Sequence, residues 1–266
     1  MAVRTDGPAV PARLATELHC KPSVNKMDAE AFVRAEVPKP RRPPIRLTAA
    51  ELIALIGTSL TDPVAPCVQT PQRGDGHAIL VLPGLFVGDA STDFARQFLT
   101  SLRYSVHGWN LGINIGPTKE LLDGAADRLI ELSDLHGPLS VVGFSMGGLF
   151  ARWLSLRMPE RIRQVITVCS PIYEPIRNFW LPVEPFLGLW PAHDFSRVVE
   201  EIVQPLPVPG TFLFSRDDGA VNSAVCLDIN AKTEDNIEIS GPHVLVTRNP
   251  RVMEILAQRL ARRFEA

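Results

Sequence analysis

Residues 139–154 read LSVVGFSMGGLFARWL, and they combine the patterns of a strand, a turn and a helix. The stretch begins with an apolar, β-branched run typical of a strand, and it ends with apolar residues at helical spacing. Between the two halves stands Ser145, among glycines that weaken both helices and strands. Local propensity does not explain this serine. A sharp turn from strand to helix does, because Gly143 and Gly147 leave room where side chains would collide with neighbouring elements.

The turn carries the pattern G-x-S-x-G at residues 143–147. In this setting the serine hydroxyl is lifted above the sheet edge, and the first N–H groups of the next helix point toward any anion formed beside it. A dinucleotide-binding turn also joins a strand to a helix through glycines. Its G-x-G-x-x-G fingerprint, however, requires glycine at the third position, where this chain has Ser145. The pattern therefore predicts that Ser145 is a catalytic nucleophile.

Short apolar runs alternate with amphipathic stretches along most of the chain. Continuous apolar runs suit strands that are buried on both faces of a parallel sheet. The expected strands are 78–82, 104–109, 139–144, 164–170, 211–215 and 236–240. The expected helices are 91–102, 118–135, 147–158 and a last one that Asn249 caps and Pro250 begins. This alternation predicts an α/β fold with a mostly parallel sheet flanked by helices.

A serine nucleophile needs a base and an acid that orients the base. Of the six histidines, His243 follows the last expected strand, at the edge where α/β sheets assemble their sites. His107, near the end of the second expected strand, is the best competitor. The acid is expected after the fifth strand, where Asp218 precedes a flexible glycine and Asp217 is its solvated neighbour. We therefore predict His243 as the base and Asp218 as the acid.

The order Ser145, Asp218, His243, together with the turn before the helix, resembles the α/β-hydrolase superfamily. Within it, the chain is most similar to bacterial lipase- and esterase-like serine hydrolases. The resemblance spans roughly residues 76–264 and rests on the segments VLPGLFVGD, GFSMGG, SRDDGAV and GPHVLVTRNP. It implies the α/β-hydrolase fold, a Ser-His-Asp catalytic triad and an acyl-enzyme intermediate.

The resemblance also implies an oxyanion hole made by the backbone N–H groups of Leu85 and Met146. Many family members carry His-Gly before the first donor, whereas this chain has Pro-Gly. A backbone N–H donates whatever its side chain, so the hole survives this change, and either Leu85 or Phe86 faces the site. The glycine-rich segment 106–117 looks like a loop beside the site in relatives, and the sequence assigns it no role.

Residues 171–210 interrupt the alternation of strands and helices. Their many prolines forbid long regular elements, whereas their aromatic residues are too apolar for a plain surface loop. We therefore predict an inserted apolar cap over about 172–205 that binds a medium or long acyl chain, excludes water and opens at a lipid surface. The alternative is that these residues complete the core. The expected substrate-binding residues are Phe86, Phe179, Trp180, Phe186 and Trp190.

Residues 1–75 differ from the rest and are expected to form an N-terminal extension. It contains a proline-rich basic connector at 37–46 and a short helix over 48–60 that ends near Gly57 and packs on the main domain, 76–266. Four scattered cysteines, the absence of a signal-peptide-like apolar run and of any membrane-spanning stretch predict a cytoplasmic protein. The cysteines are expected to be small buried hydrophobic residues.

Charge and spacing exclude several partners. A net charge of −2 and a pI near 6.3 favour neither nucleic acid nor an acidic membrane surface. No histidine or cysteine pair has the spacing of metal ligands, so no metal and no other cofactor is expected. What remains is a small-molecule ester or lipid as the substrate.

These observations predict a serine hydrolase that cleaves carboxylic esters. An acyltransferase or a perhydrolase would use the same triad and differ only in what attacks the acyl-enzyme. A hydrolase fold kept as a non-catalytic ligand receptor is a further alternative, because a fold does not determine a function.

Overall fold

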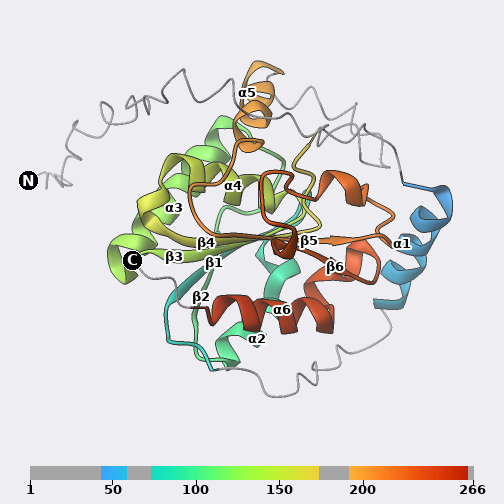
Figure 1. Cartoon of the computed structure of the whole chain (residues 1–266), viewed down its shortest axis with the longest axis horizontal. Helices are drawn as coiled ribbons and strands as arrows, with labels where there is room; N and C mark the ends of the chain where they lie inside the picture. Colours follow the sequence, from blue (N-terminus) through green and yellow to red (C-terminus); the bar gives the residue numbers. More distant parts are fainter. Residues whose placement is uncertain (1–42, 59–72, 174–191, 263–266) are drawn as a thin grey trace, which may run out of the picture. The chain divides into compact units, whose positions relative to one another are not determined.

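The computed structural model describes residues 43–58, 73–173 and 192–262. In these ranges it contains a six-stranded sheet with all strands parallel, in the order β2-β1-β3-β4-β5-β6 (Figure 1). The strands are β1 (Ala78–Leu82), β2 (Ser105–Gly108), β3 (Leu139–Phe144), β4 (Ile162–Val168), β5 (Gly210–Ser215) and β6 (Asn236–Ile239). The α/β fold is therefore confirmed, and β1 and β3 have the predicted bounds.

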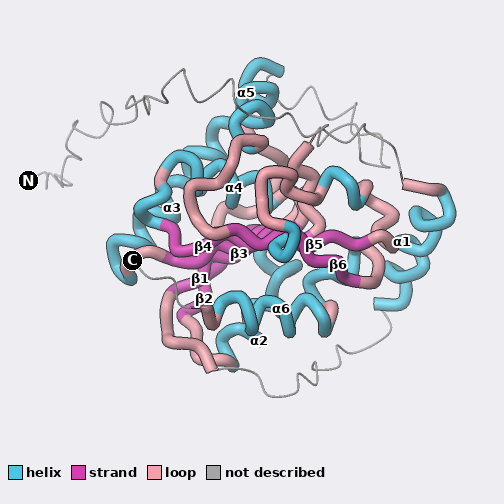
Figure 2. Tube along the Cα trace, viewed as in Figure 1, coloured by secondary structure: helices cyan, strands magenta, loops and turns pink. Residues whose placement is uncertain are grey.

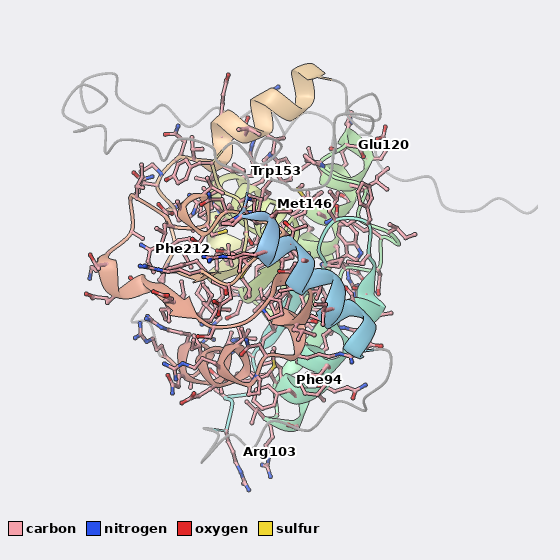
Figure 3. The ribbon with its side chains drawn as sticks, turned by 90° about the vertical axis from the view of Figure 1, so that its right-hand side faces the viewer. Phe94, Arg103, Glu120, Met146, Trp153 and Phe212 are labelled. Carbon is pink, nitrogen blue, oxygen red and sulfur yellow. The ribbon has the colours of Figure 1, made fainter. Side chains whose placement is uncertain are left out.

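Helices cover both faces of the sheet, which explains why β1 and β3 are buried along their whole length. On one face lie α3 (Lys119–His136), α4 (Gly147–Arg157) and α5 (Ala192–Ile202), and on the other α2 (Asp93–Ser101) and α6 (Pro250–Leu260) (Figure 2). Trp153 of α4 and Phe94 of α2, both labelled in Figure 3, mark these two layers. Among the helices in the described ranges, none has the length and apolar character needed to cross a membrane.

The strand order places a topological switch point between β1 and β3. The chain runs from β1 outward to β2 and then returns to β3 on the other side of β1, so the loops after β1 and β3 depart in opposite directions. Ligands of open α/β sheets bind beyond the carboxyl ends of the strands at such points. Ser145 follows β3 directly, so the predicted nucleophile lies there.

The largest differences from the predicted bounds are in α1 (Ile45–Thr58), which begins earlier, and in β4, which both begins and ends two residues earlier. Helix α1 begins three residues earlier than expected, and its last described residue is Thr58, next to Gly57, near which the sequence predicted its end. Strand β4 ends at Val168 because Cys169 adopts a φ of 49°, which leaves the extended conformation.

Most of the predicted cap lies outside the described residues. Phe179, Trp180, Phe186 and Trp190 fall in the range 174–191, of which the structure gives no description. At the two ends of this range, Ile172 and Tyr173 are buried, and α5 contributes Val198 and Ile202 to the core beneath α4. These four residues at the ends of the predicted cap therefore contribute to the core.

Arg152 connects α4 to the end of α5 and to the loop after β5 through buried hydrogen bonds and an ion pair. Its guanidinium is fully buried, lies 5.4 Å from the centre of the Phe212 ring and forms an ion pair with Asp228. It also donates to the carbonyls of Ile202 and Gln204 at 2.6 and 2.9 Å. A buried cation is tolerated only when it is paired in this way.

Candidate active site

The turn at Ser145 has a strained backbone. The φ of Ser145 is 51°, in the left-handed region, and its N–H donates to the carbonyl of Val168 at 2.8 Å. Side chains do not fit beside it: a Cβ on Gly143 would lie 2.5 Å from the carbonyl carbon of Gly147. A Cβ on Gly147 would lie 2.3 Å from the carbonyl oxygen of Leu82. Packing therefore demands both glycines, and the turn presents the Ser145 hydroxyl at the carboxyl edge of the sheet.

The imidazole of His243 links two of the other predicted residues. Its Nε2 lies 2.9 Å from Ser145 Oγ, and its Nδ1 lies 2.6 Å from Asp218 Oδ2. His243 begins the 3₁₀ helix η7 (His243–Arg248) beyond β6, and Asp218 lies in the loop after β5. With the proton on Nδ1, the imidazole donates to the carboxylate and its Nε2 accepts from the serine hydroxyl. This arrangement can remove the proton of Ser145.

Asp218 is held rigidly by its own loop. Its side chain is buried, and its Oδ1 accepts from the N–H groups of Ala220 and Val221 at 2.8 and 2.7 Å, which leaves Oδ2 for the imidazole. Asp217 is exposed, as predicted, but it is more than a solvated neighbour. Its Oδ2 accepts from the N–H of Gly241 at 2.9 Å and so ties the acid loop to the segment that precedes the histidine.

The surroundings raise the pKa of His243 above its ordinary value of 6.5. Burial by itself lowers that pKa, because it removes water from the charged imidazolium. The negative charge and hydrogen bond of Asp218, together with the charge of Glu51, act in the opposite direction and outweigh burial. The site therefore stabilises the imidazolium that forms when the imidazole takes a proton.

His107, the competing candidate for the base, has other partners. It lies on the edge strand β2, where its Nε2 is 3.0 Å from Ser105 Oγ and its ring centre is 5.1 Å from that of His136. The structure thus brings His243 to Ser145 and leaves His107 elsewhere.

The loop after β1 lies directly beside the serine. A Cβ on Gly84 would be 3.3 Å from the Cβ of Ser145. Phe86 has a φ of 62°, and its N–H donates to the carbonyl of Asn114 at 2.7 Å. That N–H is therefore engaged outside the site. Of the two donors that the sequence leaves open, the loop geometry favours Leu85.

The glycine-rich segment 106–117, to which the sequence assigns no role, supports this loop. Asn114 is fully buried, and its Nδ2 donates to the carbonyl of Pro83 at 2.8 Å. In the reverse direction, Asp89, which follows the loop after β1, accepts from the N–H of Trp109 in the glycine-rich segment at 3.0 Å. The two loops thus form one hydrogen-bonded unit. The only signal in the sequence is a polar residue between two isoleucines, which does not reveal its partner.

Cys169 adds a buried thiol next to these groups. Ligand atoms of Cys169, Asp218 and His243 all lie within 4.8 Å of one another, a spacing that could hold a metal ion. Burial, assisted by the charge of Asp218, raises the pKa of the Cys169 thiol well above its ordinary value, whereas metals bind the thiolate. Asp218 and His243 are already paired with each other. The residues therefore fit a hydrogen-bonded chain better than a metal site.

A second set of Asp, His and Ser lies at the opposite edge of the sheet. His77 Nδ1 is 2.5 Å from Asp75 Oδ1, and its Nε2 is 2.8 Å from Ser140 Oγ. Ser140 is fully buried near the start of β3, and its hydroxyl also accepts from Gln164 Nε2 at 3.3 Å. A hydroxyl without access to substrate cannot act as a nucleophile, so this second set is structural.

Comparisons with known proteins agree with this architecture. A family model described as "alpha/beta hydrolase fold" matches residues 119–209. The pimeloyl-[acyl-carrier protein] methyl ester esterase of Klebsiella pneumoniae subsp. pneumoniae is 29% identical over 165 residues. The match covers 59% of this chain and 62% of that relative, so the chain spans less than two thirds of the relative's length.

Several solved structures share the fold. An arylesterase has a TM-score of 0.57 at 11% identity, covering 71% of this chain and 76% of its own. A structure from work on the metagenome-derived lipolytic enzymes LipS and LipT has a TM-score of 0.53 at 16% identity. The match covers 74% of this chain and 96% of that structure's chain. The monoacylglycerol lipase of Paleococcus ferrophilus has a TM-score of 0.53 at 12% identity. The match covers 71% of this chain and 96% of the lipase chain. The sheet order, the family match and these likenesses establish that the chain has the α/β-hydrolase fold and resembles esterases and lipases of that superfamily.

Proposed function

We propose that this chain hydrolyses carboxylic esters, with Ser145 as nucleophile, His243 as general base and Asp218 as the acid that orients the imidazole. His243 takes the proton of Ser145 as the oxygen attacks the acyl carbon. The tetrahedral oxyanion accepts hydrogen bonds from the backbone N–H groups of Leu85 and Met146. Its collapse expels the alcohol, which takes the proton from the imidazolium, and water then cleaves the acyl-serine with His243 again as the base.

The observation that carries this proposal is the unbroken path of hydrogen bonds from Asp218 through His243 to Ser145 at a strained turn. Met146 supports it, because this residue is the N-cap of α4, where backbone N–H groups and the helix dipole favour an anion. A well-placed oxyanion donor is worth about 3 kcal/mol in the transition state.

An apolar rim supports an apolar acyl group as the substrate's reacting half. Five hydrophobic side chains between 38% and 60% exposed lie on the loops that carry or border the site: Phe86, Val87, Ile113, Ile115 and Val244. Such a rim suits a chain of methylenes and not a charged peptide. We extend this proposal to Phe179, Trp180, Phe186 and Trp190 as the lining of the acyl pocket.

A series of p-nitrophenyl esters from acetate to laurate tests this function. Burial of one methylene is worth about 0.8 kcal/mol, so each added carbon should raise kcat/KM by up to roughly fourfold until the pocket is full. Trp180→Ala and Trp190→Ala should flatten that slope and spare the acetyl ester. A loss of stability with an equal loss on every ester would instead assign both tryptophans to the core.

Two further arms separate the alternatives. Turnover of none of these esters, together with no labelling of Ser145 by a fluorophosphonate, would contradict the proposal and favour the non-catalytic receptor. Transfer of the acyl group to an added alcohol in preference to water would identify an acyltransferase.

A further inference from the structure

Helix α1, which lies outside the segment that matches the family, places a carboxylate against both catalytic loops (Figure 3, where α1 faces the viewer). Glu51 is only 2% exposed. Its Oε1 accepts from the N–H groups of Gly219 and His243 at 2.8 and 2.6 Å, and its Oε2 accepts from that of Val244 at 2.9 Å. A buried carboxylate is costly without such partners, so the three N–H groups account for its position.

The three donors belong to the two loops that carry the predicted acid and base. Gly219 directly follows Asp218, and Val244 directly follows His243. A single side chain therefore fixes the separation between the backbones on which the acid and the base are mounted. The distance of 2.6 Å between Asp218 Oδ2 and His243 Nδ1 depends on that separation of the two backbones.

Helix α1 meets the acid loop closely. Thr48 Oγ1 donates to the carbonyl of Gly219 at 3.1 Å. A Cβ on Gly219 would lie 2.2 Å from the carbonyl oxygen of Leu47, so only glycine permits this approach. The glycine that the sequence suggests as a flexible pivot for Asp218 is thus also the docking point of α1.

Glu51 also acts on the imidazole through its charge. Among the residues that the structure describes, the charged or titratable groups that face His243 are Asp218 from the loop after β5, Glu51 from α1 and the thiol of Cys169 directly after β4. The thiol is neutral, so the two carboxylates are the negative charges that hold the imidazole toward its protonated form.

We propose that Glu51 is a positioning residue of the active site, which holds the backbones of the acid and histidine loops in register and adds a second negative charge near the imidazole. This inference rests on the proposed esterase function. It assigns the Glu51 side chain of α1 a role in the site, although Glu51 lies almost a hundred residues before Ser145.

The test uses the full-length protein with Glu51→Ala, Glu51→Gln and Glu51→Asp, assayed with p-nitrophenyl butyrate. Glu51→Ala leaves three N–H groups without their acceptor, and kcat should fall by up to about 10²-fold with little change in KM, as expected for a misplaced catalytic group. Glu51→Gln removes the charge and replaces one acceptor oxygen by an NH₂ donor, while the other oxygen can still accept. It should lower kcat less and move the acid limb of the kcat/KM profile to lower pH. Glu51→Asp should keep the acid limb near its original position while kcat falls.

Thr48→Val is the matched control, because it removes a contact of α1 with the same loop without a change in charge. It should lower the melting temperature and leave the acid limb in place. ¹⁵N NMR titration of the His243 imidazole gives a readout that does not depend on turnover. The pKa should be lower in Glu51→Gln than in the wild type.

Unchanged kcat, acid limb and imidazole pKa in Glu51→Gln would overturn the proposal. A loss of kcat that follows only the fraction of folded protein, in Glu51 and Thr48 variants alike, would also overturn it. Ser145→Ala in the same series reports on the esterase function itself. If wild type and Ser145→Ala are equally inactive, the proposed function fails, whereas the NMR result still decides whether Glu51 controls the imidazole.

Discussion

His77 Nε2 lies 2.8 Å from Ser140 Oγ, almost the same separation as that between His243 and Ser145. Each imidazole also meets a carboxylate through Nδ1. The two sets differ in their surroundings: one serine sits on a strained turn before a helix, and the other is buried near the start of a strand. Hydrogen-bond geometry therefore does not identify a nucleophile unless the backbone presents the hydroxyl to substrate.

The first prediction uses this pair as experiment and control. Ser145→Ala should lower kcat for p-nitrophenyl butyrate by about 10⁶, because the residues of the proposed triad would act as a unit. Ser140→Ala should keep its activity and lose about 1–3 kcal/mol of stability, because it leaves a buried imidazole nitrogen without a partner. Kinetics and urea unfolding measure the two effects. More than a tenth of the wild-type activity in folded Ser145→Ala would exclude this serine as the nucleophile.

The second prediction concerns the neighbouring acids. Asp218→Asn should lower kcat by up to about 10⁴, because the amide favours the wrong tautomer of His243. Asp217→Asn keeps an oxygen that can accept from Gly241, so its kcat should change little. Steady-state kinetics on both variants tests which aspartate orients His243. A larger loss of kcat in Asp217→Asn than in Asp218→Asn would assign that role to Asp217.

The third prediction concerns pH. His243 must be neutral to accept a proton, and its pKa is raised above 6.5, so kcat/KM should rise with pH through a midpoint above that value. The raised pKa also means that protonated His243 contributes to stability below pH 6.5, and this contribution is lost as pH rises through the folded-state pKa. A pH series of kcat/KM and of unfolding free energy tests both signs. A kinetic midpoint below 6.5 would contradict the assignment of the base.

The fourth prediction concerns the hydrogen-bonded loops behind the proposed oxyanion hole. Asn114→Ala removes the hydrogen bond to the carbonyl of Pro83 and should let the N–H of Leu85 drift from its place. We expect kcat to fall by about 10- to 100-fold with a smaller change in KM, because an oxyanion donor acts mainly in the transition state. Asn110→Gly, on the exposed side of the same loop, serves as the comparison, because glycine keeps the left-handed backbone of Asn110 (φ 59°) without strain. Equal kcat in both variants would assign Asn114 to stability alone.

The sequence predicted what depends on local pattern. The apolar runs at 78–82 and 139–144 mark strands buried on both faces, and their periodicity is visible without any knowledge of neighbours. Ser145 could be singled out because its glycines make sense only in a tight turn. His243 followed from its place after the last strand, since parallel strands bring their carboxyl ends to one edge.

The residues that the sequence did not reveal act across long separations. Glu51 appears there as one charge in an apolar helix, and Asn114 as one amide in a glycine-rich loop. Their partners lie 168 to 193 and 31 residues away, respectively. Such pairings follow from how loops pack over the sheet edge, which periodicity and local propensity do not describe. The end of β4 was predicted two residues too late for a similar reason. Cys169 adopts a left-handed backbone conformation that the sequence would have indicated only if the residue were a glycine.

Because α1 contacts Gly219, a shortened form of this protein must include α1 if the loop that carries Asp218 is to keep its hydrogen bonds. A form trimmed to begin at β1 would keep the whole sheet and the residues Ser145, Asp218 and His243. It would nevertheless expose the carbonyl of Gly219 and strip the N–H groups of three loop residues of their acceptor. Engineers who shorten the chain, or who graft its catalytic loops onto another hydrolase, should therefore carry residues 45–58 along with them.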